Sequence, residues 1–416
     1  MDKFKLFLYT IAILIQNQLI GRRQMLKSLI VITAGLMMAG LSFAADARDI
    51  ILGASMAKTG PYATTARTSE TAIDIAVSEI NAAGGINGMK IKLIKFDTGG
   101  DPKQAQIAVK RFAQDDKALA VIGPFASGEA RVAFPAGERL GIVQIPNASS
   151  GPKLADKFSY AYRLTEGEFL QFTRLIVTMK RKGLKIDNTQ IAYVSDEFIS
   201  KIVGTKLMPV IFKMQKVKII GDAVGFPTAA FDIAPQISKL VQNPAQNVAV
   251  AGIVEATVKT AKELRRQGHK GRIIGSGLSA DPDLAGKLGK DGEGTLYAAW
   301  FWKDRDARTK SFTAKFNALN KKRGISKTNP HHVDASAYDI VYLLKAAIEK
   351  AGVTGDPKKL KAERTAIRDV LKTIKFNGVT GNICFDKNGD AELPAYIMEV
   401  HNSDVRMIDS HPAKKC

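Results

Sequence analysis

Cysteine and histidine are both scarce in this chain, with two cysteines and five histidines in 416 residues. Cys384 and Cys416 can form at most one disulfide, and the sequence leaves open whether they do so. The adjacent His331 and His332 point apart and have no third ligand nearby, so we interpret them as part of a solvated turn and not as a metal site. A Gly-x-Ser-x-Gly elbow and an evident catalytic triad are also missing. We therefore expect no enzyme, no metal and no cofactor.

Two weaker motifs do not change this expectation. Residues 275–280 match Gly-x-Gly-x-x-Ala, but the acid that a dinucleotide site needs about 20 residues later is not clear. Residues 386–392 are rich in acids, but Gly389 falls at position 4 and Ile397 at position 12 of an EF-hand alignment, where that motif needs other residues. A hairpin turn at Asn388 and Gly389, between strands at 379–385 and 394–400, explains the segment better.

Acidic residues are outnumbered, 40 against 61 lysines and arginines, which gives a formal net charge of +21. Such an excess attracts anions in general. The basic residues are scattered, however, and no aromatic-basic recognition module accompanies them, so nucleic acid is not a predicted partner.

Long apolar runs occur only near the N-terminus. Residues 25–44 combine a lysine, an uncharged apolar run and small residues at 42 and 44, which is the pattern of a secretory signal peptide. We interpret residues 1–24 as an upstream extension and Met25 as the true start. The alternative is one long uncleaved anchor, against which the polar residues between the two apolar runs argue. We expect the rest of the chain to be exported to the periplasm.

After the signal peptide, short apolar segments alternate with amphipathic ones. This alternation predicts an α/β protein with two doubly wound parallel-sheet lobes, the break falling near residue 165. The predicted strands are 50–53, 90–97, 190–195, 217–224, 247–253, 271–276 and 294–300, and the predicted helices include 68–81, 199–213, 231–242, 255–267, 307–322, 334–350 and 358–374.

Two further apolar strands each end in a serine-bearing turn that leads into a helix, at residues 119–134 and 141–156. In a parallel sheet both turns lie at the carboxyl edge, where ligand crevices form. Small residues let a ligand approach the backbone, and hydroxyls and free helix N–H groups can hold an anion such as a carboxylate.

Together these features resemble the extracytoplasmic solute-binding proteins of ABC importers. The resemblance is greatest to the leucine/isoleucine/valine-binding branch, which has the type I periplasmic binding fold. It covers nearly all of the chain after residue 44, and the order and spacing of its strings make it specific. These strings are KTGPYA (58–63), EINAAGGINGMKIKLIKFD (79–97), DPKQA (101–105), VIGPFAS (121–127), PNASSGPKL (146–154), SAYDIVYLLKAAIEKAG (336–352) and FDKNGD (385–390).

The resemblance implies two lobes joined by a three-strand hinge, with the ligand between them. Lobe 1 would contain residues 48–165 and 300–378, and lobe 2 residues 166–299 and 379–416. It also implies a membrane permease of an ABC importer as partner, and we expect the protein to be a monomer.

Carried over by position, the resemblance places a ligand carboxylate at Ser127 and at Ala148, Ser149 and Ser150. Hydroxyls and helix-start amides suit that group. For any single serine, a plain helix N-cap is the alternative role.

The resemblance also places Tyr62 and Phe198 against the apolar part of the ligand, although either could be a core aromatic. One departure affects the ligand's amine. Relatives place a glutamate where this chain reads GSGL (275–278), so Gly277 or a neighbour stands in its place, and a buried ammonium without a partner is costly. Either another acid replaces it, with Glu255 and Asp196 as candidates, or the ligand has no amine.

The sequence thus predicts the solute-binding component of an ABC importer that captures a small carboxylate-bearing ligand, a branched-chain or other apolar amino acid. Two alternatives stay open. One is a binder of amine-free carboxylic acids, aromatic ones included. The other is a ligand-sensing domain for amides or urea.

Overall fold

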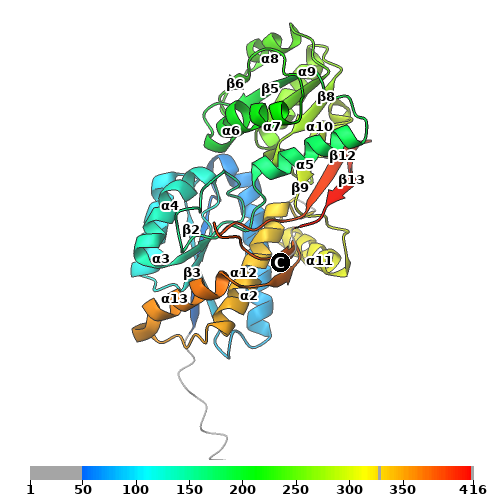
Figure 1. Cartoon of the computed structure of the whole chain (residues 1–416). Helices are drawn as coiled ribbons and strands as arrows, with labels where there is room; N and C mark the ends of the chain where they lie inside the picture. The colour runs from blue at the N-terminus through cyan, green and yellow to red at the C-terminus, as the bar shows by residue number, and fades with distance from the viewer. Residues whose placement is uncertain (1–48, 327–328, 414–416) are drawn as a thin grey trace, which may run out of the picture. The chain divides into compact units, whose positions relative to one another are not determined.

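The computed structural model describes residues 49–326 and 329–413. These residues form two main sheets, each covered by helices (Figure 1). The predicted signal peptide and upstream extension lie outside the described residues. So does Cys416, whereas Cys384 is disulfide-bonded. In the described part, no helix combines the length and the apolar character that a membrane crossing requires.

The first sheet has four parallel strands in the order β2-β1-β3-β4. These strands are β1 (Ile50–Met56), β2 (Ile91–Asp97), β3 (Ala120–Ile122) and β4 (Val143–Ile145). The helices of this half are α2 (Ala63–Ala82), α3 (Pro102–Gln114), α4 (Ser127–Leu140), α11 (Ala307–Lys322), α12 (His332–Lys350) and α13 (Leu360–Leu371). Strand β1 is apolar and buried along nearly its whole length because helices cover both faces of the sheet.

The second sheet has seven strands in the order β13-β12-β9-β8-β7-β5-β6. They are β5 (Thr189–Val194), β6 (Val224–Phe226), β7 (Asn247–Ala251), β8 (Arg272–Gly275), β9 (Leu296–Ala299), β12 (Ala395–His401) and β13 (Asp404–His411). Its helices are α5 (Glu168–Arg181), α6 (Phe198–Ile202), α7 (Met208–Met214), α8 (Ala234–Val241), α9 (Val254–Arg266) and α10 (Leu284–Leu288). Strands β5 to β9 are parallel, and β12 runs antiparallel to both β9 and β13.

The alternating pattern is confirmed, but the predicted pairing around Asn388 and Gly389 is wrong. Residues 379–385 contain β11 (Gly381–Ile383), which pairs with β10 (Phe376–Gly378). Strand β12 is buried on both faces and fills a place inside the second sheet. The predicted turn itself is present as a short local hairpin, in which Phe385 and Ala391 form an antiparallel bridge and the N–H of Gly389 donates to the carbonyl of Asp386 at 3.0 Å.

Within the described residues the chain passes between the two halves three times, after β4, after β9 and before β12. An ion pair and a hydrogen bond connect the first and third passages. The Arg163 guanidinium forms a two-pronged ion pair with Asp390, and the carboxylate of Glu166 accepts the backbone N–H of Leu393 at 2.6 Å. The lobe boundaries stay a prediction. Because Val379 through Leu393 contribute side chains to the first core, we propose that lobe 1 extends to about residue 393.

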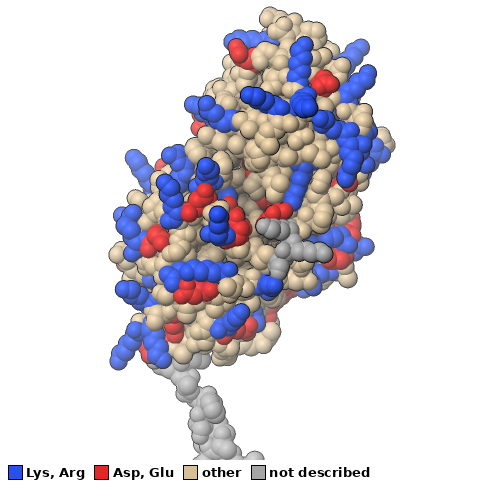
Figure 2. Space-filling model, in the orientation of Figure 1, with Lys and Arg blue, Asp and Glu red and all other residues tan. Residues whose placement is uncertain are grey.

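Basic side chains are spread over both halves of the face in Figure 2, with acidic residues among them. This distribution agrees with the scattered lysines and arginines of the sequence.

Candidate functional site

A cavity of about 60 Å³ lies where the carboxyl ends of the two sheets meet. A cavity needs a volume of about 10–15 Å³ to hold a single water molecule, so this one has room for a small molecule. Its walls come from turns that follow β3, β4, β5, β7, β8 and β9, the edge at which parallel sheets form ligand sites. The lining residues are Tyr62, Thr65, Phe125, Ala126, Ser127, Ala148, Ser150, Glu168, Ile199, Ile253, Gly277, Leu278, Trp300, His331, His332 and Val333.

The two serine turns meet on one side of this cavity. Ser127 is the first residue of α4, and its hydroxyl accepts the backbone N–H of Gly151 at 3.1 Å. Ser150 lies beside it on the second turn, and Ala148 also lines the wall. The first amides of a 14-residue helix have no partner within the helix and carry its positive dipole end. This side of the cavity therefore suits an anionic group.

Glu168, which the sequence analysis did not identify, supplies an acid to the same cavity. It is the first residue of α5 and is 2% exposed. Its carboxylate accepts the N–H of Gly277 at 3.2 Å and faces the Ser150 hydroxyl at 3.5 Å. Burial raises the pKa of Glu168 to about 7, although these two hydrogen bonds favour the ionised form.

Gly277 explains why the acid can approach so closely. A Cβ atom at this position would lie 1.4 Å from the Gln171 side-chain oxygen and 2.8 Å from the Glu168 carboxylate. A larger residue here would displace the side chains of Gln171 and Glu168, so glycine lets the turn after β8 pack against the start of α5 in this arrangement.

Five of the eight residues singled out from the sequence line the cavity, namely Tyr62, Ser127, Ala148, Ser150 and Gly277. Ser149 does not, because its side chain is buried away from the cavity and its hydroxyl donates to the carbonyl of Phe125 at 3.0 Å. Its role here is to fasten one serine turn to the other.

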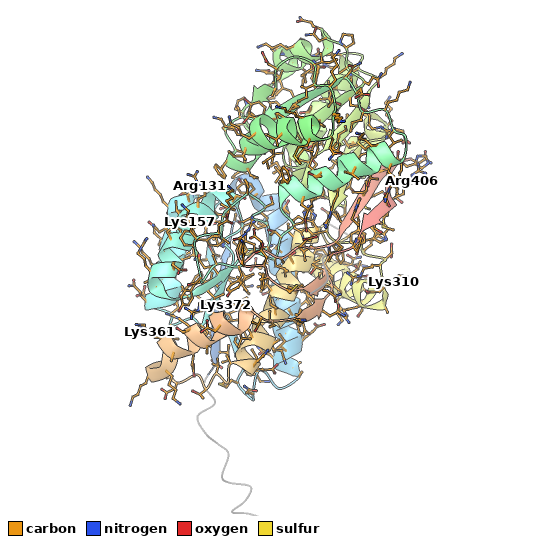
Figure 3. All side chains as sticks on the ribbon, in the orientation of Figure 1. Arg131, Lys157, Lys310, Lys361, Lys372 and Arg406 are labelled. Atoms are coloured by element: carbon orange, nitrogen blue, oxygen red, sulfur yellow. The ribbon has the colours of Figure 1, made fainter. Side chains whose placement is uncertain are left out.

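Phe198 also lies outside the cavity wall, and its neighbour Ile199 takes the lining position. The Glu197 carboxylate caps α6 by accepting the N–H groups of Ile199 and Ser200, which sets the rotation of the helix. The guanidinium carbon of Arg131 lies 4.6 Å from the centroid of the Phe198 ring. Arg131 projects from α4 (Figure 3).

Neither acid proposed from the sequence as the ammonium partner reaches the cavity wall. The Glu255 side chain is about half exposed and faces Lys287 at 3.7 Å. Asp196 accepts the N–H and the hydroxyl of Thr228, both at 2.8 Å.

Aromatic rings form much of the remaining wall. The prediction that His331 and His332 lie in a solvated turn is wrong, since they are 5% and 4% exposed and both line the cavity. His332 stacks on Trp300 with ring centroids 3.5 Å apart, and the indole N–H of Trp300 donates to Ser336 at 2.8 Å. Nothing in the sequence indicated this stack, because it forms between Trp300, which follows β9, and His332, which begins α12.

A hydrogen bond to Tyr62 also joins the two halves, in addition to the one between Ser150 and Glu168. The Tyr62 hydroxyl donates to the carboxylate of Glu197 at 2.7 Å. Burial, followed by the negative charge of Glu197, raises the pKa of the Tyr62 phenol, so the phenol keeps its proton at neutral pH.

The buried Glu168 predicts a specific dependence of folding stability on pH. Its pKa is about 7 in the folded protein and close to the ordinary 4.5 when unfolded. Between these values the unfolded chain releases the proton and the folded one keeps it, so the contribution of Glu168 to wild-type stability falls as pH rises from 4.5 to 7 and then levels off. Glu168→Gln removes this contribution. The melting temperature of the variant should match wild type near pH 4 and exceed it at pH 8, and an equal shift at both values would contradict the prediction.

Comparison with known proteins supports the architecture. The sequence profile of the family described as periplasmic binding protein matches residues 49–404. The chain is 25% identical over 368 residues to the leucine-, isoleucine-, valine-, threonine- and alanine-binding protein of Pseudomonas aeruginosa, covering 85% of this chain and 89% of that protein. It is 27% identical over 374 residues to Leu/Ile/Val-binding protein homolog 2 of Brucella abortus, covering 87% and 91%.

Solved structures share the fold. A branched-chain amino acid transporter substrate-binding protein from Streptococcus pneumoniae, in complex with isoleucine, aligns with a TM-score of 0.75 at 21% identity and covers 88% of this chain and 100% of that one. A solute-binding protein of an ABC transporter from Rhodopseudomonas palustris, in complex with p-hydroxybenzoic acid, gives 0.75 at 19% identity and covers 88% and 98%. The predicted fold class, with two α/β lobes, is confirmed.

Proposed function

The chain belongs to the periplasmic binding protein family, and we propose that it is the extracytoplasmic solute-binding component of an ABC importer. In this proposal residues 25–44 direct export, and the two lobes close over a ligand that is handed unchanged to a membrane permease. Family membership supports the extracytoplasmic location, and the curated relatives are named for binding and not for catalysis.

We propose an apolar α-amino acid as the ligand. The observation that carries this is the meeting, in one cavity, of the Ser127 and Ser150 hydroxyls with the buried carboxylate of Glu168. The hydroxyls and the start of α4 would take the ligand carboxylate, and Glu168 would pair with its ammonium. Glu168 thereby replaces the acid missing at Gly277, and the apolar walls, which include Ile199 and Leu278, accommodate the side chain.

An amine-free aromatic acid is the second candidate. With a pKa of about 7, Glu168 can hold a proton at little cost and donate it to a carboxylate, which would remove the repulsion between two acids. The rings of Tyr62, Phe125 and Trp300 offer aromatic contacts.

Thermal unfolding with matched ligands distinguishes these candidates. The panel contains leucine, leucinamide, 4-methylpentanoate and 4-hydroxybenzoate. Leucine should raise the melting temperature in proportion to the logarithm of its concentration, and leucine recovered afterwards should be chemically unchanged. Stabilisation by 4-hydroxybenzoate alone would favour the second candidate. Stabilisation by leucinamide but by no acid would contradict both.

The hydrogen bond between Tyr62 and Glu197 should slow ligand release, because it forms only when the two halves approach each other. Removing the hydroxyl in Tyr62→Phe keeps the ring against the ligand and deletes this bond. A net hydrogen bond to a charged group contributes about 1.5–3 kcal/mol, so the dissociation rate should rise roughly tenfold or more. Stopped-flow dissociation of leucine measures this. A lower association rate with unchanged release would contradict the closing role.

A further inference from the structure

A second cavity of about 70 Å³ lies directly behind the first one. Its walls come from β9, β12 and β13, from the turn after β8 and from the passage after β9. They combine apolar and aromatic side chains with the charged residues Asp281, Lys303 and Asp404. The side chains that matter here are Tyr297, Phe301, Trp302, Met398 and Val405. His332 lines both cavities, so its side chain forms part of the partition between them.

This partition is held firmly in place. His332 is the first residue of α12, and its ring lies parallel to that of Trp300, with 8° between the planes. Trp300 is 2% exposed and is fixed by its hydrogen bond to Ser336 on the next turn of α12. The imidazole is therefore backed by a ring that has no room to move aside.

We propose that His332 is the residue that limits ligand length, and that the cavity behind it accepts the apolar tail of a longer carboxylate once the imidazole is removed. This inference rests on the proposed function, since it needs a ligand whose charged head lies at Ser127 and Ser150. In the wild-type protein the tail ends against the Trp300–His332 stack. Without the imidazole, a phenyl ring on a three-carbon tail would pass beneath Trp300 and enter the second cavity between Trp302 and Met398.

Isothermal titration of His332→Ala with leucine and with 2-amino-5-phenylpentanoate tests the proposal. His332→Ser provides a second variant that keeps a polar side chain at the start of the helix. We expect wild type to bind the phenyl ligand at least 30-fold more weakly than leucine. Each variant should bind the phenyl ligand at least tenfold more tightly than wild type does, and its ratio of phenyl-ligand affinity to leucine affinity should rise by at least tenfold.

The double variant His332→Ala/Val405→Phe tests whether the phenyl tail of the ligand occupies the second cavity. The new ring would fill the second cavity from the exposed strand β13, and it should abolish the gain for the phenyl ligand. If the His332 variants retained leucine binding but bound the phenyl ligand no more tightly than wild type, this inference would be wrong while the proposed function would stand. The same conclusion would follow if the gain in phenyl-ligand affinity survived Val405→Phe. If wild type bound no carboxylate, the proposed function would fail, and this inference with it.

Discussion

Glu168→Gln is expected to weaken leucine binding by about 100-fold and to leave binding of 4-methylpentanoate unchanged or improved. The substitution keeps the size of the side chain and its acceptor for the N–H of Gly277, and it removes only the negative charge. A 100-fold loss corresponds to about 2.7 kcal/mol. Losing one partner of a desolvated charge pair typically costs about 2–5 kcal/mol, because the ligand's ammonium stays buried without a counterion.

The same variant should change how leucine affinity depends on pH. Leucine's ammonium pairs with the ionised form of Glu168, whose pKa is about 7 in the unliganded cavity. Wild-type affinity should therefore rise as pH increases from 5 to 7 and level off above that, whereas Glu168→Gln should show a flat profile. Titration calorimetry across this range measures both profiles.

Glu349→Gln is the matched control, since Glu349 is exposed on α12 and pairs with Lys345, one turn earlier in the helix. It should retain wild-type affinity at every pH. Equal losses for leucine and 4-methylpentanoate in Glu168→Gln would show that Glu168 shapes the cavity and does not hold an ammonium.

The sequence predicted the parts of the site that follow directly from a strand. Ser127 and Ser150 each come a few residues after a short apolar strand, and the topology of a parallel sheet is enough to bring such turns to one edge. Glu168 could not be found in this way. It lies at the start of a helix in the other half of the molecule, and it faces Ser150 only because the first passage between the halves turns back toward that edge.

The misplaced ring of Phe198 has a more local cause. This segment lies beside the cavity, but which of its residues faces inward depends on where α6 starts. Glu197 fixes that start by capping two backbone N–H groups, and the resulting rotation turns Ile199 inward. A shift of one residue changes the facing side chain by about 100° in a helix. Composition and spacing alone do not resolve such a shift.

Replacing both Ser127 and Ser150 by alanine should weaken leucine binding by 100-fold or more. Each hydroxyl that donates to a carboxylate contributes about 1.5–3 kcal/mol, so either single variant should lose about 10- to 150-fold. Because the two serines would contact the same carboxylate, the double loss should differ from the sum of the single losses. Calorimetric affinities of wild type, both single variants and the double variant complete the cycle.

Leucinamide provides the test of whether the serines recognise charge. Its neutral amide has less to gain from the hydroxyls and from the start of α4, so the serine variants should lose much less affinity for it than for leucine. Ser149→Ala serves as the matched control. Its hydroxyl bonds to the carbonyl of Phe125, so its loss should lower folding stability by about 1 kcal/mol and leave the leucine-to-leucinamide ratio unchanged. If Ser127→Ala instead reduced binding of both ligands equally, Ser127 would contribute only through its hydrogen bond with the N–H of Gly151. The carboxylate of the ligand would then have to be held elsewhere.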